Sequence, residues 1–382
     1  MTKKLLLLLL LVAIGGTTAQ ATIRRVGFIA TVERIDGFDF TTFQAAHDAS
    51  VNGDTIQLYP TTSGTVSYSG TITKRLVVLG PGYFYNVFQT SGAEITNPNL
   101  QNLAGNIQSV SLTMNLGSAG TILMGLNNLT VNVVNRQEAL NNITITRCRN
   151  VVVNWDNSGI LNKWTISQCY GLSIAQTGPS AGFTSDRTVD SLDIYNCLIN
   201  GPINLNTSPS GTYVGNRIYN CVLISGTTLT LNNAAFLVQN CIFEIPTNSL
   251  SGLTNTRFIR NITTAATASN GINNTAPNAG NIFGQVLNNI FVNYPTMGTT
   301  NGVNNSSLDG RFQLKTGTNP AANAGLSIID NTTAVDMGMY GGTTPYILSG
   351  IPSIPIFYQL GAASAVTVGS SYTVTFSVRN NN

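Results

Sequence analysis

The sequence predicts an all-β protein wound as a right-handed parallel β-helix, with a cap helix at the N-terminal side and a short β tail. Three observations support this: a repeat of 19 to 28 residues, a composition poor in helix formers, and ends rich in Pro and Gly. Only 9% of the 382 residues are charged, and Asn, Thr, Ser and Gly supply most of the polarity. None of these four residues favours a helix interior. The handedness follows from the general rule for parallel crossovers, not from the repeat itself.

The repeat is clearest in the tetrapeptide IYNC, which occurs at 194–197 and again at 218–221. Each cysteine of the chain follows a β-branched residue three positions earlier and a polar residue one position earlier. The same pattern continues without cysteine in LNNL, FIRNI and VLNNI, with slots at 129, 262 and 290. Periods of this size are typical of solenoids. The cysteines are Cys148, Cys169, Cys197, Cys221 and Cys241.

Each repeat is expected to contain a sharp bend just before the cysteine position. The cysteine and the residue three before it are both apolar, so both should point inward, whereas side chains alternate along a straight strand. Asn suits the bend because it tolerates the left-handed conformation. Stacked turns would then form an inward column of free thiols and an amide ladder. The alternative for the thiols is a disulfide between adjacent turns. The predicted ladder contains Asn196, Asn220, Asn240, Asn261 and Asn289. A leucine-rich repeat is the competing solenoid, but its L-x-x-L-x-L motif is missing.

The first residues resemble a secretory signal peptide. Lys3 and Lys4 precede the apolar run LLLLLLLVAI, and small residues follow it. No later run of 18 apolar residues could span a membrane. The predicted divisions are a signal peptide at 1–21, an N-terminal segment at 22–37, the β-helix with its caps at 38–350, and a β tail at 351–382. We therefore expect export, to the extracellular medium, the cell surface or the periplasm.

Both ends of the solenoid are expected to be protected. The segment FDFTTFQAAHDAS predicts a short helix with Thr41 and Gln44 forming a capping box, and Phe43 in its apolar face. His47, the only histidine, is expected on the surface of that helix. At the other end SYTVTFSV alternates, and such a strand needs a partner. We expect it to pair with RRVGFIATV of the same chain; the alternative is pairing with another protein or another copy.

The chain resembles the pectin-lyase-like superfamily of right-handed β-helices. The resemblance rests on TTFQAAHDAS…NGDTIQLYP, RLVVLGPGYF, the IYNC-type repeats and NPAANAG…DMGMYGGTTPYILSGIP, and covers about residues 38–355. More narrowly, the chain is similar to secreted β-helix repeat proteins of Bacteroidota-type bacteria. The superfamily contains lyases, hydrolases, epimerases, tailspikes and non-catalytic adhesive proteins, so the resemblance implies the fold but no single activity.

The enzymes of the superfamily imply clustered carboxylates, which are scarce here. A calcium site needs several oxygen ligands, and glycoside hydrolysis needs two carboxyl groups at a set separation. The chain has 15 acidic residues, mostly near its ends. The one cluster within the repeats is SDRTVDSLD, which makes Asp186, Asp190 and Asp193 the catalytic or metal-binding candidates. The alternative is a solvated loop with a local Asp–Arg pair.

Basic and aromatic residues on neighbouring repeats form a second candidate site. Stacked on one flank of the solenoid, they could bind an acidic glycan, with the rings as a surface for sugars. The alternative is ordinary surface decoration. The candidates are Arg147, Arg149, Lys163, Trp164 and Tyr170.

The intact repeat and the scarcity of acid–base residues favour a non-catalytic exported surface protein, acting as a scaffold or as a glycan-binding adhesin. One alternative is a polysaccharide lyase or glycoside hydrolase with an atypical site in the loop 176–193. Another is a surface filament that self-associates through its C-terminal strand. No cofactor and no resident metal are expected. No nucleic-acid partner is expected either, because the net charge is only +3 and no basic run accompanies aromatic residues.

Overall fold

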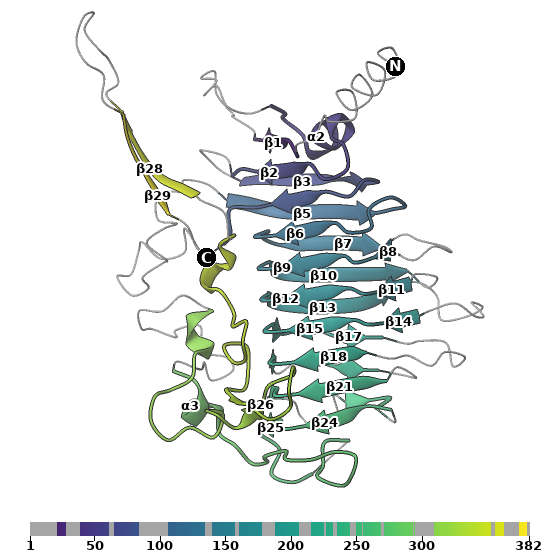
Figure 1. Cartoon of the computed structure of the whole chain (residues 1–382), viewed down its shortest axis with the longest axis vertical. Helices are drawn as coiled ribbons and strands as arrows, with labels where there is room; N and C mark the ends of the chain where they lie inside the picture. Colours follow the sequence, from purple (N-terminus) through teal and green to yellow (C-terminus); the bar gives the residue numbers. More distant parts are fainter. Residues whose placement is uncertain are drawn as a thin grey trace, which may run out of the picture.

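The computed structural model describes most of the predicted solenoid. The described residues are 21–27, 39–60, 65–83, 106–133, 140–156, 160–177, 188–205, 215–224, 227–231, 235–244, 250–253, 255–268, 271–292, 294, 309–352, 356–362 and 374–379. The predicted signal peptide up to residue 20 lies outside these ranges, as do Asp186 and Arg187. Within them the chain is mostly β, and its strands stack in long parallel sheets (Figure 1). The predicted all-β, solenoid-like stack is confirmed.

Sheet A has ten parallel strands, and each turn of the solenoid adds one of them. Its strands are β1 (Ile23–Val26), β2 (Thr55–Leu58), β4 (Val77–Leu79), β6 (Ile122–Met124), β9 (Thr144–Thr146), β12 (Thr165–Ser167), β15 (Asp193–Tyr195), β18 (Asn216–Tyr219), β21 (Phe236–Gln239) and β24 (Arg257–Ile259).

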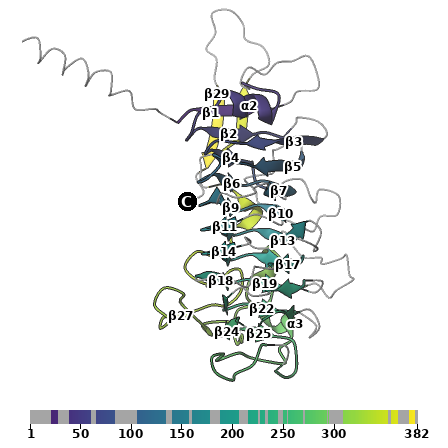
Figure 2. The ribbon, with the colours of Figure 1, turned by 90° about the vertical axis from the view of Figure 1, so that its right-hand side faces the viewer.

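Sheet B runs beside sheet A and contains twelve strands. They are β3 (Thr65–Ile72), β5 (Asn106–Met114), β7 (Leu129–Val133), β10 (Arg149–Asp156), β13 (Tyr170–Thr177), β16 (Leu198–Ile199), β17 (Ile203–Asn204), β19 (Val222–Leu223), β20 (Leu229–Thr230), β22 (Ile242–Phe243), β23 (Leu250–Ser251) and β25 (Ile262–Thr263). A short sheet C joins β8 (Leu140–Asn141), β11 (Ile160–Asn162) and β14 (Thr188–Asp190). Figure 2 shows the same stack from the side.

The backbone bends at the residue before each cysteine, where the sequence predicts a bend. These five corner residues are left-handed, with φ between 51° and 56°. The bend lets the cysteine and the residue three before it both point inward. All five cysteines are buried and free. The corner residues are Arg147, Gln168, Asn196, Asn220 and Asn240.

One flanking repeat, FIRNI, is shifted from the predicted alignment. Ile259 pairs with Gln239 and Ile262 with Ile242, which puts Arg260 at the corner and Asn261 in the cysteine column. Phe258 therefore fills the inward position predicted for Ile259. Because these two neighbours are both apolar, the sequence pattern allows either alignment. Asn261 is buried and its Nδ2 donates to the carbonyl oxygen of Val238 at 3.0 Å.

The other two predicted slots also differ. Leu123 pairs with Ile145, so Leu126, not Leu129, occupies the cysteine column. Asn289 lies in the helical turn α3 (Leu287–Ile290) and belongs to no ladder. Both segments have apolar residues three apart, a spacing that a helical turn satisfies as well as a bent strand.

The N-terminal helix is α2 (Phe43–Ala49), and it packs on β1, β2 and β3. Phe43 is buried as predicted. The N-cap is Thr42, not Thr41: the Thr42 side chain accepts a hydrogen bond from the amide of Ala45. Thr41 and Thr42 are adjacent hydroxyl residues, so the sequence pattern is ambiguous by one position.

Side chains of α2 satisfy the backbone of β3, the end strand of the described sheet B. Gln44 Oε1 accepts a hydrogen bond from Thr71 N at 2.9 Å, and His47 Nε2 accepts one from Thr73 N at 3.1 Å. His47 is only 3% exposed, so the predicted surface position is wrong. The edge of a sheet presents unpaired backbone amides, and His47 supplies an acceptor for one of them.

The segment 309–352, here called the strap, runs back along the outside of the solenoid (Figure 1). It contains η2 (Gly310–Phe312), the antiparallel pair β26 (Gly325–Leu326) and β27 (Ala334–Val335), and η3 (Leu348–Gly350). A second hydrophobic core lies between the strap and sheet B, in addition to the core inside the solenoid. The strap thus covers one flank of the stack.

The C-terminal strand β29 (Val374–Arg379) pairs antiparallel with β28 (Ile356–Ala362). The described part of RRVGFIATV lies in and beside β1, which pairs with β2 and not with β29. Closing the short loop between β28 and β29 costs less entropy than bringing the two ends of the chain together. No helix among the described residues is long and apolar enough to cross a membrane.

Candidate functional site

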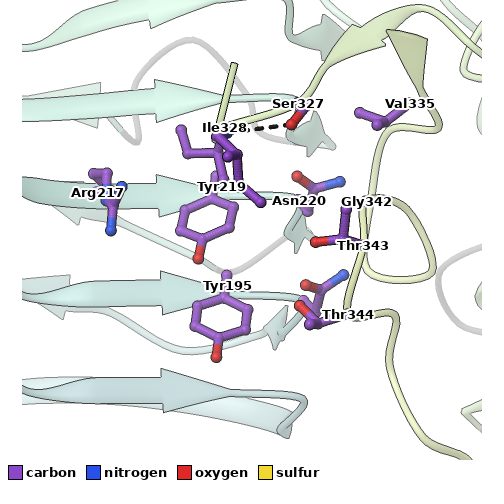
Figure 3. A pocket seen from close by; sticks show the side chains of 12 residues that line it. Tyr195, Arg217, Tyr219, Asn220, Ser327, Ile328, Val335, Gly342, Thr343 and Thr344 are labelled. Atoms are coloured by element: carbon purple, nitrogen blue, oxygen red, sulfur yellow. Dashed lines mark hydrogen bonds between the residues drawn. The ribbon is translucent and has the colours of Figure 1, made fainter. Parts of the chain in front are cut away.

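A pocket of about 400 Å³ opens between sheet A and the strap (Figure 3). Strands β15 and β18 form one wall, and the strap around β26 and β27 forms the other. Its lining residues are Tyr195, Asn196, Arg217, Tyr219, Asn220, Ser327, Ile328, Ile329, Val335, Gly342, Thr343 and Thr344. We call it the tyrosine pocket.

The two copies of IYNC place the tyrosines. Tyr195 and Tyr219 are register partners on β15 and β18, and both rings are half-buried on the outer face of sheet A. Their centroids are 4.9 Å apart and their planes differ by 15°. The hydroxyl groups point the same way in Figure 3. Ile194 and Ile218 alternate with the tyrosines and point into the core.

An ion pair borders the tyrosines. Arg217 donates from Nε to Asp193 Oδ1 at 2.7 Å and from Nη2 to Oδ2 at 2.6 Å, a bidentate pair. The guanidinium carbon lies 5.6 Å from the centroid of the Tyr219 ring. Hydrogen bonding to Asp193 raises the pKa of Arg217, while burial, reinforced by the Asp193 charge, raises the pKa of Tyr219 well above its ordinary value. The pair is locally neutral, and Tyr219 keeps its proton at neutral pH.

The strap wall of the pocket is apolar at its tip. Ile328 is half-buried, whereas Ile329 is 77% exposed beside the pocket. The turn that carries them is held by Asp330, whose Oδ1 accepts hydrogen bonds from Thr332 N and Thr333 N, both at 2.9 Å. A ligand in the pocket would therefore meet aromatic rings on one side and an aliphatic tip on the other.

The corner amides hold the strap in place. Asn240 Nδ2 donates to Leu326 O at 2.7 Å, and Asn220 Nδ2 donates to Asp336 O at 3.1 Å. Asn196 Nδ2 donates to two strap carbonyl groups, those of Met339 at 2.9 Å and Gly341 at 2.7 Å. Two rung-to-rung amide bonds remain in the predicted ladder, from Asn240 to Asn220 at 3.3 Å and from Asn261 to Asn281 at 3.0 Å. The amides of the predicted ladder thus mainly bind the strap.

The predicted basic and aromatic flank does not form one exposed face. Trp164 is fully buried, and its Nε1 donates to Leu140 O at 2.6 Å. The strap covers Arg147, whose Nη1 donates to Ile351 O at 2.9 Å, and Tyr170, whose ring lies 6.3 Å from that of Phe312.

The remaining two basic residues lie apart from these contacts. Lys163 is exposed at a left-handed corner before β12, with φ of 55°, and Arg149 is half-buried at the start of β10. Because the backbone bends at each corner, residues that are close in the sequence lie on different faces of the solenoid. These side chains therefore do not form one site.

The candidate carboxylates Asp190 and Asp193 lie in different surroundings. Asp190 ends β14, in register with Asn162 of sheet C, whereas Asp193 is held by Arg217. Asp186 lies outside the described residues. Where the chain is described, no three His, Cys, Asp or Glu side chains are grouped so that they could hold a metal ion.

The tyrosine pocket has a sequence signal that charge and aromatic content do not reveal. Tyr195 and Tyr219 occupy the same position in the two IYNC copies. Each tyrosine lies between an Ile that points inward and the corner Asn, so its own side chain points outward. Two aromatic residues at one outward register position predict adjacent rings on the sheet surface. The strap wall has no such local signal.

No protein-family model matches the chain, and no curated protein matches its sequence.

Proposed function

We propose that the chain is an exported, non-catalytic right-handed β-helix of the pectin-lyase-like type that binds a neutral glycan in the tyrosine pocket. The observation that carries this proposal is the parallel pair of Tyr195 and Tyr219 beside a neutralised arginine. The solenoid holds the pair rigidly, and α2 acts as a cap for the N-terminal rung. The leader-like start of the chain supports export.

A pyranose ring has apolar C–H faces and a rim of hydroxyl groups. The pocket offers matching surfaces: tyrosine rings and Ile328 for the faces, and the exposed side chains of Thr343 and Thr344 for the rim. Tyrosine is suited to such surfaces because it combines a large apolar ring with a polar end. The pocket volume of about 400 Å³ lies within the range of small-molecule sites, roughly 300–1,000 Å³.

The ion pair favours a neutral glycan over the acidic one that the basic flank suggested. Arg217 already binds the carboxylate of Asp193 with both ends of its fork. A uronate would have to displace that partner, which would leave Asp193 beside a second negative charge. Neutral hydroxyl groups can bind at the rim without breaking the pair.

The lining residues favour binding without bond cleavage. They include no carboxylate and no imidazole. Hydrolysis of a glycosidic bond needs an acid and a second carboxylate on opposite sides of that bond. Asp193, the nearest candidate from the sequence, borders the pocket but is committed to Arg217.

The test is retention of the purified chain, residues 22–382, on a panel of neutral and acidic polysaccharides, with new chain ends measured in parallel. We expect retention on a neutral glycan, and a loss of roughly tenfold in affinity for Tyr219→Ala, the loss of one stacking contact. Tyr219→Phe keeps the ring and is expected to keep most of the binding. Tyr59→Ala, a half-buried tyrosine outside the pocket, is the matched control.

Binding is expected to stay constant as the pH rises past 9. The raised pKa of Tyr219 keeps its hydroxyl group protonated beyond the point where an ordinary tyrosine, with a pKa of about 10, begins to ionise. New chain ends, binding restricted to acidic glycans, or equal affinities for Tyr219→Ala and the parent chain would each refute the proposal.

A further inference from the structure

The outer face of sheet B carries a regular array of short, uncharged polar side chains. The strands β3, β5, β7, β10 and β13 are stacked one above another (Figure 1), and their registers align outward positions into columns along the solenoid. The first column is Ser69, Ser111, Thr130, Val152 and Ser173. The second column is Thr71, Thr113, Asn132, Asn154 and Ala175.

The second column continues beyond β13. Ile174 pairs with Ile203, which aligns Asn204 with the column, and Asn204 pairs with Thr230. Thr230 pairs in turn with Ser251 on β23. The column then crosses eight strands with a hydroxyl or amide at every position except Ala175. None of its residues is charged, and none is aromatic.

Hydrogen bonds inside the array fix four of its side chains in advance. Asn154 Nδ2 donates to Asn132 Oδ1 at 2.9 Å, and the hydroxyl groups of Thr230 and Ser251 lie 3.0 Å apart. The array members are half-buried or exposed, whereas the alternating residues point into the core. Ordered groups lose little further entropy when a ligand binds, so these four side chains are preorganised.

The spacing of the array matches ordered water. Neighbouring strands lie about 4.8 Å apart, and alternate residues of one strand about 6.7 Å apart. Water molecules linked by hydrogen bonds of about 2.75 Å in tetrahedral geometry have second neighbours at about 4.5 Å. The strand repeat is within about 0.3 Å of that value. Over three adjacent strands the two spacings diverge by only about 0.6 Å, so each short stretch of a column can engage part of a row of an ice lattice.

The chemistry of the array also narrows the partner. A charged polymer would find no counter-charge in either column, and a sugar would find no aromatic surface to stack on. Hydroxyl and amide groups donate and accept hydrogen bonds, as each water molecule in ice does. We propose that the part of the outer face of sheet B that carries these two columns binds the surface of ice. This face is distinct from the tyrosine pocket, so the proposal does not depend on glycan binding.

The experiment measures ice-recrystallisation inhibition and thermal hysteresis with the purified chain, residues 22–382. Thr113→Tyr places a large ring at the second of the eight positions of the second column, between Thr71 and Asn132, and is expected to abolish both activities. Thr165→Tyr is the matched control, because Thr165 is a half-buried outward threonine on sheet A. Tyr219→Ala is expected to keep full activity. Circular dichroism and thermal unfolding confirm that each variant is folded.

An inactive parent chain would overturn the proposal, and so would full activity in a folded Thr113→Tyr variant. Retention on crystalline cellulose that Thr113→Tyr abolishes, without any effect on ice, would assign the face to a solid glycan instead. A dimer that Thr113→Tyr dissociates would assign it to a second copy of the chain. Loss of activity in Thr113→Tyr alone, with both controls active, supports the proposal.

Discussion

At the scale of single residues, the corner column shows why Asn, Gln and Arg occupy positions where glycine would bend more easily. A non-glycine residue in the left-handed region costs roughly 1–2 kcal/mol. Gln168 and Arg147 adopt this conformation, each with φ of 53°, and their longer side chains reach the strap. Gln168 Nε2 donates to Pro345 O at 2.6 Å. The hydrogen bonds to the strap offset the strain of the bend.

Replacing Asn196 with glycine separates these two effects. Asn196→Gly keeps the bend but removes both donors to Met339 and Gly341. We expect a loss of about 1–3 kcal/mol in the free energy of unfolding, because two strap carbonyl groups lose their partners. Asn142→Gly, at an exposed left-handed corner with φ of 59°, is the control and is expected to be neutral or stabilising. Equal effects in urea unfolding would show that the strap bonds contribute nothing.

At the scale of elements, the N-terminal rung depends on one buried carboxylate. Asp54 accepts hydrogen bonds from Thr22 N at 2.9 Å, Val51 N at 3.0 Å and Arg24 Nε at 3.1 Å. Burial alone would raise the pKa of Asp54, but the hydrogen bonds from Thr22, Val51 and Arg24 outweigh it and lower the pKa. The carboxylate thus ties β1 to the turn that precedes β2.

This lowered pKa predicts an acid-sensitive N-terminal rung. A carboxylate whose folded pKa lies below its unfolded value, about 3.9, stabilises the fold above that value and loses the contribution as the pH falls through the folded pKa. We expect amide exchange in residues 22–26 to increase below about pH 4. Asp54→Asn is expected to remove this pH dependence and to raise exchange at neutral pH. Asp330→Asn, at an exposed carboxylate of the strap, should leave exchange in residues 22–26 as in the parent. An unchanged acid response in Asp54→Asn would contradict the account.

At the scale of the whole molecule, the strap closes a second core that the solenoid alone leaves open. Leu198, Val222 and Ile242 are buried against the strap. The buried Asp309 ties the two ends of the strap together, because it accepts hydrogen bonds from the hydroxyl group of Tyr346 at 3.0 Å and from Ser349 N at 2.6 Å. The strap is therefore a structural part of the fold and also the second wall of the tyrosine pocket.

Truncation of the chain tests the structural role of the strap. A chain that ends after residue 308 lacks the strap and exposes the apolar residues of sheet B. We expect it to bind hydrophobic dyes and to self-associate, since large exposed apolar patches promote association. A chain that ends after residue 352 keeps the strap and loses only β28 and β29, and it should remain folded and monomeric. Monomeric behaviour of the shorter chain in light scattering would refute a structural role for the strap.

The sequence alone determined the stacked parallel strands, the corner positions at the five cysteines and the inward cysteine column, because alternation and left-handed tolerance act over a few residues. It left the alignment of FIRNI ambiguous, because Phe258 and Ile259 are both apolar neighbours. Only the tertiary structure decided that Trp164 is buried, that the strap covers Arg147 and Tyr170, and that the tyrosines line a pocket. Asn196 and Met339 are 143 positions apart. Contacts at such separations depend on how a segment docks on the finished solenoid, which no local pattern encodes.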